Sequence, residues 1–167
     1  MGLGVDATAA AEKSRWMGPA RYDVWIILKI LGIGWRKPLP CTLEIDGEAK
    51  ALDLFVLTIM NNKFTGTHHR VSPYAQMDDG KIDIMYTPNP IRSVSKALKL
   101  DDQIKKGGTH VLDPLVAYAT ATSSIKLTSD QQIRVLNDGD IIGFSPVQMS
   151  VMPQAVSVLT PEESKPC

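Results

Sequence analysis

Residues 41–60 read CTLEIDGEAKALDLFVLTIM and place a strand pattern, a turn and a second strand pattern in direct succession. In residues 41–45 apolar and polar side chains alternate, which is the two-residue period of a half-buried β-strand. Asp46-Gly47 is a dipeptide typical of a tight β-hairpin. Residues 52–60 form a nearly continuous apolar run, which predicts a single strand at the centre of a sheet.

Similar short patterns continue towards the C-terminus. Strands are expected at 82–86, 115–122, 124–128, 133–136, 147–151 and 156–159, with a turn at 137–139 between two of them. Residues 61–77 form a long polar loop, and loops of that length in compact domains are commonly functional. The predicted fold is mainly β (α+β), an antiparallel β-sandwich with two helical insertions.

Two stretches have a helical period. Residues 9–34 carry apolar side chains at spacings of three and four, and Gly18-Pro19 is expected to break this helix, because proline favours a first helical turn. Residues 91–106 form the second helix, which Gly107-Gly108 can end. The apolar residues 24–31 could line an acyl-chain pocket, although packing into the core is the simpler interpretation.

The charge balance excludes one class of function. The chain has 18 basic and 18 acidic residues, whereas a nucleic-acid-binding protein should be visibly basic. Residues 1–40 hold six basic and three acidic residues, and residues 101–167 hold five and eight. An anionic ligand is therefore expected at the basic N-terminal end.

The length of 167 residues fits one domain, which we expect over 1–160, followed by a polar tail over 161–167. Cys41 and Cys167 are the two cysteines and give no disulfide framework, which favours a reducing, cytoplasmic compartment. The N-terminus lacks the pattern of a secretory signal. The most apolar stretch, 24–35, is shorter than the roughly 20 residues that span a bilayer.

Two further patterns favour a structural interpretation. Residues 2–7 satisfy the dinucleotide pattern GxGxxA, but that pattern needs a preceding strand, so a tight turn is the better interpretation. His68, His69 and His110 have no acidic residue or cysteine at a ligand-like spacing. We therefore expect solvated loop histidines and no metal bound by them.

Three groups of charged residues are candidates for chemistry. Glu12, Arg15 and Arg21 could clamp phosphate oxygens, because one guanidinium group can bind two phosphate oxygens at once. Alternatively, these residues could be ordinary charges on the surface of a helix. The acidic turns 78–80 and 138–140 are explained by turn chemistry alone. Alternatively, their carboxylates could hold a divalent cation or accept a proton.

Several of these segments resemble one family. Residues 11–23, AEKSRWMGPARYD, resemble a segment of sphingosine kinases and ceramide kinases, and residues 72–80, SPYAQMDDG, resemble a turn of the same enzymes. GGTHV at 107–111 and LNDGD at 136–140 lie where these enzymes and diacylglycerol kinases carry G-x-H and DGE. The resemblance runs in order along nearly the whole chain. It implies a lipid kinase of the sphingosine, ceramide or diacylglycerol type.

Such kinases have two domains, and this chain resembles the C-terminal β-sandwich only. The nucleotide is held by a GGDGT-type loop of the N-terminal domain, and no GGDGT-like run occurs here. The resemblance therefore implies the lipid-binding part of an ATP- and Mg²⁺-dependent kinase, inactive alone, cytoplasmic and peripherally membrane-associated. Its implied partners are the lipid substrate, the nucleotide-binding domain and a membrane surface. The alternative is a non-catalytic β-sandwich that binds lipid or a partner.

The resemblance also implies roles for the first charged group. Glu12, Arg15 and Arg21 match positions that contact the nucleotide phosphates. Thr8 stands where sphingosine kinases have a substrate-binding Asp. That difference disfavours recognition of a sphingoid amine and leaves ceramide, diacylglycerol or another lipid open.

The two acidic turns acquire implied roles in the same way. Asp79 matches the carboxylate of a structural Mg²⁺ site, with the backbone carbonyls of Gln76 and Lys81 as further ligands. Asp138 and Asp140 match the catalytic turn near the transferring phosphate. Asp140 replaces the usual Glu of DGE, so its side chain is one methylene shorter.

Overall fold

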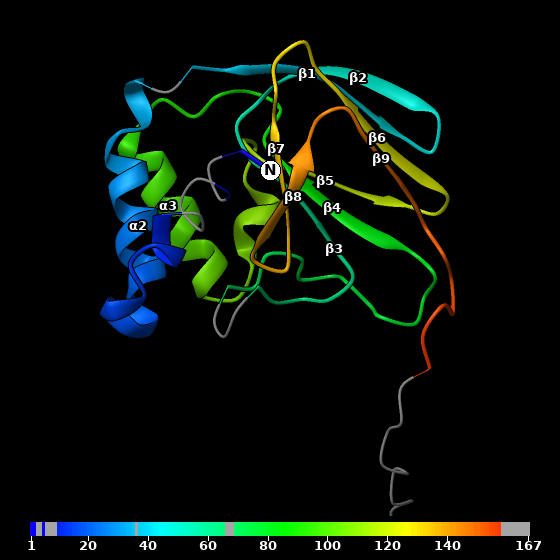
Figure 1. The fold of residues 1–167 in the computed structure, drawn as a ribbon, viewed down its shortest axis with the longest axis horizontal. Coiled ribbons are helices and arrows are strands. Elements are labelled where there is room, and N and C mark those ends of the chain that lie inside the picture. The colour runs from blue at the N-terminus through cyan, green and yellow to red at the C-terminus, as the bar shows by residue number, and fades with distance from the viewer. Residues whose placement is uncertain (3–4, 6–9, 36, 66–68, 158–167) are drawn as a thin grey trace, which may run out of the picture.

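The computed structural model describes residues 1–2, 5, 10–35, 37–65 and 69–157. Two helices, α2 (Arg21–Leu31) and α3 (Val94–Lys105), stand together on one side of the molecule, and the strands fill the other side (Figure 1). The nine labelled strands are antiparallel wherever they pair. The predicted mainly β class is confirmed.

The strands of the described residues form three sheets. The first has the order β2-β1-β6-β9: Glu48–Leu54, Leu39–Ile45, Ser124–Thr128 and Val147–Ser150. The second has the order β3-β4-β5: Leu57–Met60, Ile82–Tyr86 and Ala117–Ala121. The third is the hairpin of β7 (Arg134–Asn137) and β8 (Asp140–Phe144). Buried side chains of the two larger sheets share the main core, among them Leu43, Leu54, Ile84, Ile125 and Leu127.

The prediction of one strand over 52–60 is wrong. Within this run β2 ends and β3 begins in the other sheet. At the crossing the N–H of Val56 donates to Oγ1 of Thr87, and the N–H of Thr87 donates to the carbonyl of Val56, both at 3.0 Å. Phe55 is buried beside the helices. The run is continuously apolar because the chain passes from one buried layer to another.

The predicted break in the first helical stretch is confirmed. Gly18 has φ 64° and ψ −156°, a conformation that favours glycine, and it interrupts η1 (Arg15–Ala20) before α2 begins. The stretch ends in η2 (Ile33–Trp35). Ile30 and Ile33 pack with Phe55 and with residues of α3 in a second core cluster.

The second predicted helix is confirmed as α3. Oγ of Ser93 accepts a hydrogen bond from the N–H of Lys96 and caps the first turn. At the other end the N–H of Gly108 donates to the carbonyl of Gln103 at 2.9 Å, and Gly107 and Gly108 both have positive φ. The short helix η3 (Thr109–Leu112) follows.

The other strands agree in part with the sequence. The strands at 82–86 and 124–128 have the predicted bounds. The bounds of β5, β7 and β9 differ from the predicted ones by one or two residues. β8 was not predicted. Val156 and Ser157 lie outside any strand, and the rest of the predicted strand 156–159 and the tail 161–167 lie outside the described residues.

Gly2 supports the interpretation of a tight turn. It has φ 79°, and the N–H of Val5 donates to its carbonyl at 3.2 Å. Gly2 also pairs with Val56, so a Cβ at this position would collide with the carbonyl oxygen of Phe55. Gly4 lies outside the described residues.

Candidate functional site

The structure brings Glu12 and Arg21 together at the start of α2. Nη1 of Arg21 donates to the carbonyl of Gly18 at 3.0 Å, and Nη2 lies 3.4 Å from Oε1 of Glu12. The side chain of Arg21 is 19% exposed and that of Glu12 is 30% exposed, so the pair is half-buried. These contacts hold the guanidinium in one orientation, and its fork of donors suits phosphate oxygens. Arg15 lies in η1, and its side chain lies outside the described part of the chain.

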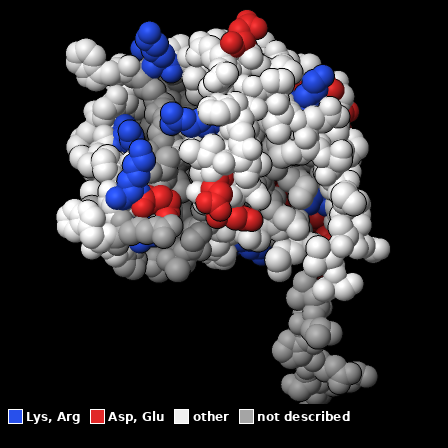
Figure 2. Space-filling view, in the orientation of Figure 1, with Lys and Arg blue, Asp and Glu red and all other residues white. Residues whose placement is uncertain are grey.

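Asp138 and Asp140 lie on the turn between β7 and β8. Asp138 has φ 47° and Gly139 has φ 100°, and Asp140 pairs with Asn137 as the first residue of β8. Both carboxylates are exposed. Figure 2 shows a face on which basic side chains gather over the helical side, with acidic side chains nearer the middle. Such a face offers cations to phosphates and carboxylates to a hydroxyl.

The predicted Mg²⁺ ligands lie in one turn before β4. Oδ1 of Asp79 accepts a hydrogen bond from the N–H of Lys81 at 2.9 Å, and Gln76, Asp79 and Lys81 are all exposed. A carboxylate with backbone carbonyls is a donor set that suits a hard cation. Among the described residues no group of three or more His, Cys, Asp or Glu side chains could hold a metal. A cation here would depend on the carbonyls of Gln76 and Lys81.

The prediction of solvated histidines is wrong for His110. This side chain is fully buried, and its Nε2 lies 2.9 Å from the carbonyl of Val71. Burial lowers the pKa of His110. His69 is 21% exposed, with Nε2 3.9 Å from Oδ1 of Asp23, and His68 lies outside the described residues. His110 therefore holds the long loop at Val71 against η3.

A buried polar group escaped the sequence analysis. The hydroxyl of Tyr118 on β5 donates to Oδ1 of Asp83 on β4 at 2.6 Å, and Asp83 is only 3% exposed. The ring of Tyr74 meets that of Tyr118 edge to face at 5.6 Å. Burial and the neighbouring Asp83 raise the pKa of Tyr118. No sequence signal indicated this contact, because the pairing of β4 with β5 and the packing of Tyr74 against Tyr118 bring together residues that are distant along the chain.

A lysine joins the two helices. Nζ of Lys105 on α3 lies 2.8 Å from Oδ1 of Asp23 on α2 and 2.9 Å from Oδ2 of Asp101. Burial lowers the pKa of Lys105, but the hydrogen bonds to the two carboxylates outweigh it, and the net pKa is raised. The sequence carried no signal for this contact, because it joins residues distant along the chain.

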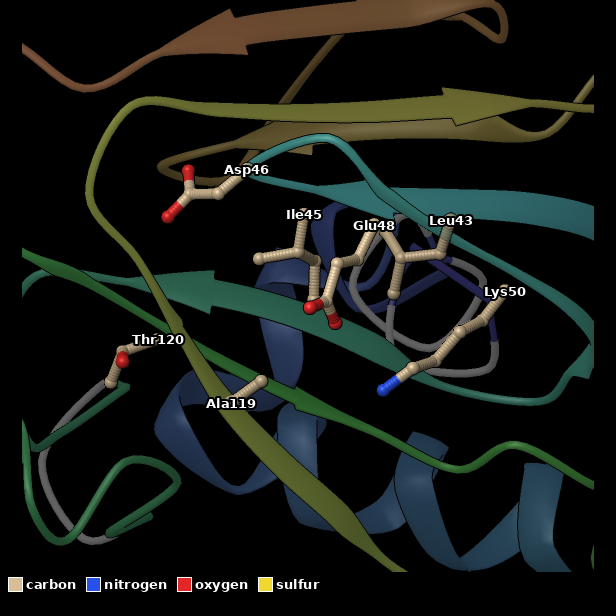
Figure 3. A pocket seen from close by; sticks show the side chains of 7 residues that line it. All are labelled: Leu43, Ile45, Asp46, Glu48, Lys50, Ala119 and Thr120. Atoms are coloured by element: carbon tan, nitrogen blue, oxygen red, sulfur yellow. The ribbon is translucent and has the colours of Figure 1, made fainter.

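A hollow of about 270 Å³ lies between the two larger sheets (Figure 3). Glu48 and Lys50 point into it from β2, opposite Ala119 of β5 (Figure 3). Asp46 stands at its end, where its carboxylate accepts five hydrogen bonds from residues 122–124. Those bonds lower the pKa of Asp46 and fasten the β1–β2 hairpin turn to the connection that leads from β5 in one sheet to β6 in the other.

Comparison with known proteins identifies the class of this β-sandwich. Residues 1–160 match the family of the YegS C-terminal NAD kinase beta sandwich-like domain, and the chain belongs to that family. The predicted resemblance to kinases of this type is thereby confirmed.

The relatives bear a more specific name. Diacylglycerol kinases from two strains of Mycobacterium tuberculosis, CDC 1551 / Oshkosh and H37Rv, are each 29% identical over 153 residues. The match covers 90% of this chain and 47% of theirs, so the chain spans about half the length of these relatives.

Solved structures show the same fold. A provisionally named diacylglycerol kinase from Bacillus anthracis strain Sterne superposes with a TM-score of 0.57 at 19% identity, covering 77% of this chain and 41% of that protein. A second structure from that strain, described as a diacylglycerol kinase, gives 0.51 at 17% identity, covering 77% and 43%. At these identities the likeness concerns the fold.

Proposed function

We propose that the chain is the C-terminal domain of an ATP- and Mg²⁺-dependent lipid kinase that phosphorylates a hydroxyl of a diacylglycerol, ceramide or sphingoid lipid. The observation that carries this proposal is the half-buried Glu12–Arg21 pair at the start of α2. It presents an oriented guanidinium in a chain whose relatives are named diacylglycerol kinase. Among the three lipid classes, that name favours diacylglycerol.

Phosphoryl transfer depends on positioning and on charge neutralisation. Arg21, together with Arg15, would neutralise phosphate charge. Asp138 and Asp140 would orient the lipid hydroxyl and take its proton, while its oxygen bonds to the γ-phosphorus of ATP and the bond to ADP breaks. Bound Mg²⁺ would neutralise phosphate oxygens. Asp140 is one methylene shorter than the Glu of the resembling kinases, so its reach towards the hydroxyl would be reduced.

A nucleotide-binding domain would complete the site. The strand that begins with Asp140 carries three exposed apolar residues, Ile141, Ile142 and Phe144, at 47%, 65% and 49% exposure. An apolar surface beside the acidic turn is typical of an interface. A domain docked there would place its nucleotide next to the hairpin carboxylates. The chain alone should therefore transfer no phosphate.

A non-catalytic lipid- or partner-binding module is the second candidate. One feature of the sequence favours it: Asp140 stands where the resembling kinases carry Glu. Both candidates would bind lipid, but only the kinase domain would gain turnover from a nucleotide-binding domain.

The test is a reconstitution with radiolabelled ATP. The purified chain is assayed with diacylglycerol, ceramide and sphingosine in mixed micelles, with and without the separately expressed GGDGT-bearing half of a relative. Labelled lipid is expected only with both halves present. Asp138→Asn should remove it, and Asp130→Asn, at another exposed carboxylate, should not.

The other outcomes are equally informative. Turnover by the chain alone would contradict a site shared between two domains. Retained lipid binding without turnover in the reconstituted mixture would favour the non-catalytic module.

A further inference from the structure

Residues 107–110 follow α3 and take no direct part in the proposed phosphoryl transfer. α3 is the longest described helix, with 12 residues, and no described helix is long and apolar enough to cross a membrane. At its end the chain turns through Gly108 into η3, in which His110 is completely buried. A completely buried histidine is held by a specific partner, and the partner here belongs to the long loop.

Position 108 is a glycine because the long loop passes directly over it. Gly108 has φ 81°, in the left-handed region that favours glycine. A Cβ at this position would also lie 2.9 Å from Cβ of Pro73 and 3.1 Å from the carbonyl oxygen of Arg70. A side chain at 108 would therefore push the loop away from the end of α3.

Two hydrogen bonds attach the loop at the same place. The N–H of Arg70 donates to the carbonyl of Ile104, in the last turn of α3, at 3.2 Å. Nε2 of His110 lies 2.9 Å from the carbonyl oxygen of Val71. Because a carbonyl can only accept, the imidazole carries its proton on Nε2 and is the donor. Val71 is itself buried, so water is a poor substitute for this donor.

A short segment leads from this attachment to the turn assigned to Mg²⁺, which comprises residues 76–81 and is called the cation turn below. Four residues separate Val71 from Gln76. Within them the N–H of Ala75 donates to the carbonyl of Ser72 at 3.1 Å, and both residues are almost completely buried. The ring of Tyr74 packs edge to face against the second sheet. The segment is compact, so the position of Val71 determines where Gln76 lies.

The cation turn depends on this placement more than a cluster of side chains would. Two of its three proposed ligands are backbone carbonyls, those of Gln76 and Lys81, and a carbonyl points where the backbone directs it. At its far end the turn continues into β4, which is paired on both sides. At its near end the attachment at Val71 sets its direction.

We propose that Gly108 and His110 are positioning residues for the cation turn. They hold the loop so that the turn keeps its carboxylate and carbonyls in one arrangement before a cation binds. His110 would touch neither the cation nor the nucleotide and would act through Val71. This inference rests on the proposed function, because the Mg²⁺ site is taken from it.

The first measurement is hydrogen exchange of the full chain without metal. The N–H groups of Ala75 and Lys81 are bonded within the segment and the turn, so their exchange rates report whether both are held. His110→Leu retains bulk but no donor, and should speed exchange at both positions about tenfold, the effect of one hydrogen bond. His110→Gln places an amide nitrogen near the position of Nε2 and should restore most of the protection. Amides of β1 and β2 should exchange at the parent rate.

The second measurement is calorimetric titration of the same variants with Mg²⁺. His110→Leu should weaken Mg²⁺ binding about tenfold, and His110→Gln should restore most of it. Gly108→Ala should also weaken binding, because its Cβ displaces the loop. Gly47→Ala is the matched control: Gly47 has φ 91°, but a Cβ there would meet no atom within 4 Å. It should bind Mg²⁺ as the parent does.

The two measurements separate this inference from the site on which it rests. Unchanged exchange at Ala75 and Lys81 in His110→Leu would overturn the positioning role. An equal rise in β1 and β2 would overturn it too, because that result is a general loss of stability. Mg²⁺ binding that is the same in the parent and His110→Leu would refute the inference and leave the proposed Mg²⁺ site intact. Absence of Mg²⁺ binding by the parent would refute both.

Discussion

The hydroxyl of Tyr118 donates a 2.6 Å hydrogen bond to Oδ1 of Asp83, on the face of the second sheet that turns away from the main core. Asp83 is almost completely buried, so this bond satisfies a carboxyl that water cannot reach. The contact also fixes the position of the Tyr118 ring, against which Tyr74 of the long loop packs. Loss of the hydroxyl should therefore loosen both the sheet and the loop.

Tyr118→Phe is expected to lower the free energy of unfolding by about 1.5–3 kcal/mol, the range for a hydrogen bond to a charged group, because Asp83 loses its donor. Urea denaturation monitored by circular dichroism measures the change. Tyr74→Phe keeps the edge-to-face ring contact and should cost much less. Equal losses in the two variants would contradict a special role for the Tyr118 hydroxyl.

The same bond predicts an alkaline limb of stability. Burial and Asp83 raise the pKa of Tyr118 above that of unfolded tyrosine, near 10. The folded state then holds the proton more tightly than the unfolded state, so the stabilisation is present below pH of about 10 and is lost as pH rises through the higher folded pKa. Tyr118→Phe should remove this slope in melting temperature against pH. An unchanged slope would contradict the assignment.

Asp46 gives the opposite pH dependence. Five hydrogen bonds from residues 122–124 depress the pKa of Asp46 below the unfolded value, near 4. Its contribution is therefore present above pH of about 4 and is lost as pH falls through the folded pKa. Asp46→Asn should lower the melting temperature at neutral pH, and the difference from the parent should shrink in acid. Asp53→Asn, at an exposed β2 position, is the matched control.

Local patterns predicted the strands whose sequences alternate and the breaks where glycine is required. The pattern of residues 41–45 gave β1, and Gly18 ended the first helical piece, because both depend on nearest neighbours along the chain. The run 52–60 led to a wrong prediction, because a segment that passes from one sheet to another is buried on all sides and has the same apolar sequence pattern as a central strand. Periodicity reports burial, and it does not report which layer covers a residue.

The candidate site was predictable only in part, for a related reason. Glu12 and Arg21 are nine residues apart, and a single turn at Gly18 suffices to bring them together. Asp83 and Tyr118 are 35 residues apart and meet through strand pairing, so neither residue alone signals the contact. The turn dipeptide at Asp46 indicated a hairpin but gave no sign of the hydroxyl and amide donors that Asp46 binds on the connection between β5 and β6.

Cys41 is expected to be unreactive in the folded protein. It lies 7% exposed in the main core, and burial raises the pKa of its thiol. In a Cys167→Ser variant, a thiol reagent should label native protein about a thousandfold or more slowly than denatured protein, because the core opens only on unfolding. Rapid labelling without denaturant would show that the sandwich opens locally near β1.

The turn at Asp79 predicts a Mg²⁺-dependent melting temperature. If carbonyls of Gln76 and Lys81 complete the donor set, Mg²⁺ at a hundred times its dissociation constant should stabilise the fold by about 2.7 kcal/mol. Asp79→Asn should abolish the rise, and Asp78→Asn should retain it. If the parent melts identically with and without Mg²⁺, the segment is a structural turn without a cation.

Arg21 offers the most direct test of the nucleotide assignment. In the reconstituted kinase, Arg21→Ala should lower kcat/KM for ATP. The loss of transition-state stabilisation calculated from that fall should be about 1.5–3 kcal/mol, the range for a hydrogen bond to a charged group. Arg21→Lys keeps the positive charge but cannot reproduce the planar fork, so it should restore little activity. A merely structural role would instead lower the melting temperature and leave the ATP kinetics of the folded fraction unchanged.

Glu12→Gln retains an oxygen that can accept from Nη2 and should have the smaller effect. Arg92→Ala, at an exposed position before α3, is the control. Equal ATP kinetics in the parent and Arg21→Ala would remove Arg21 from the phosphate site.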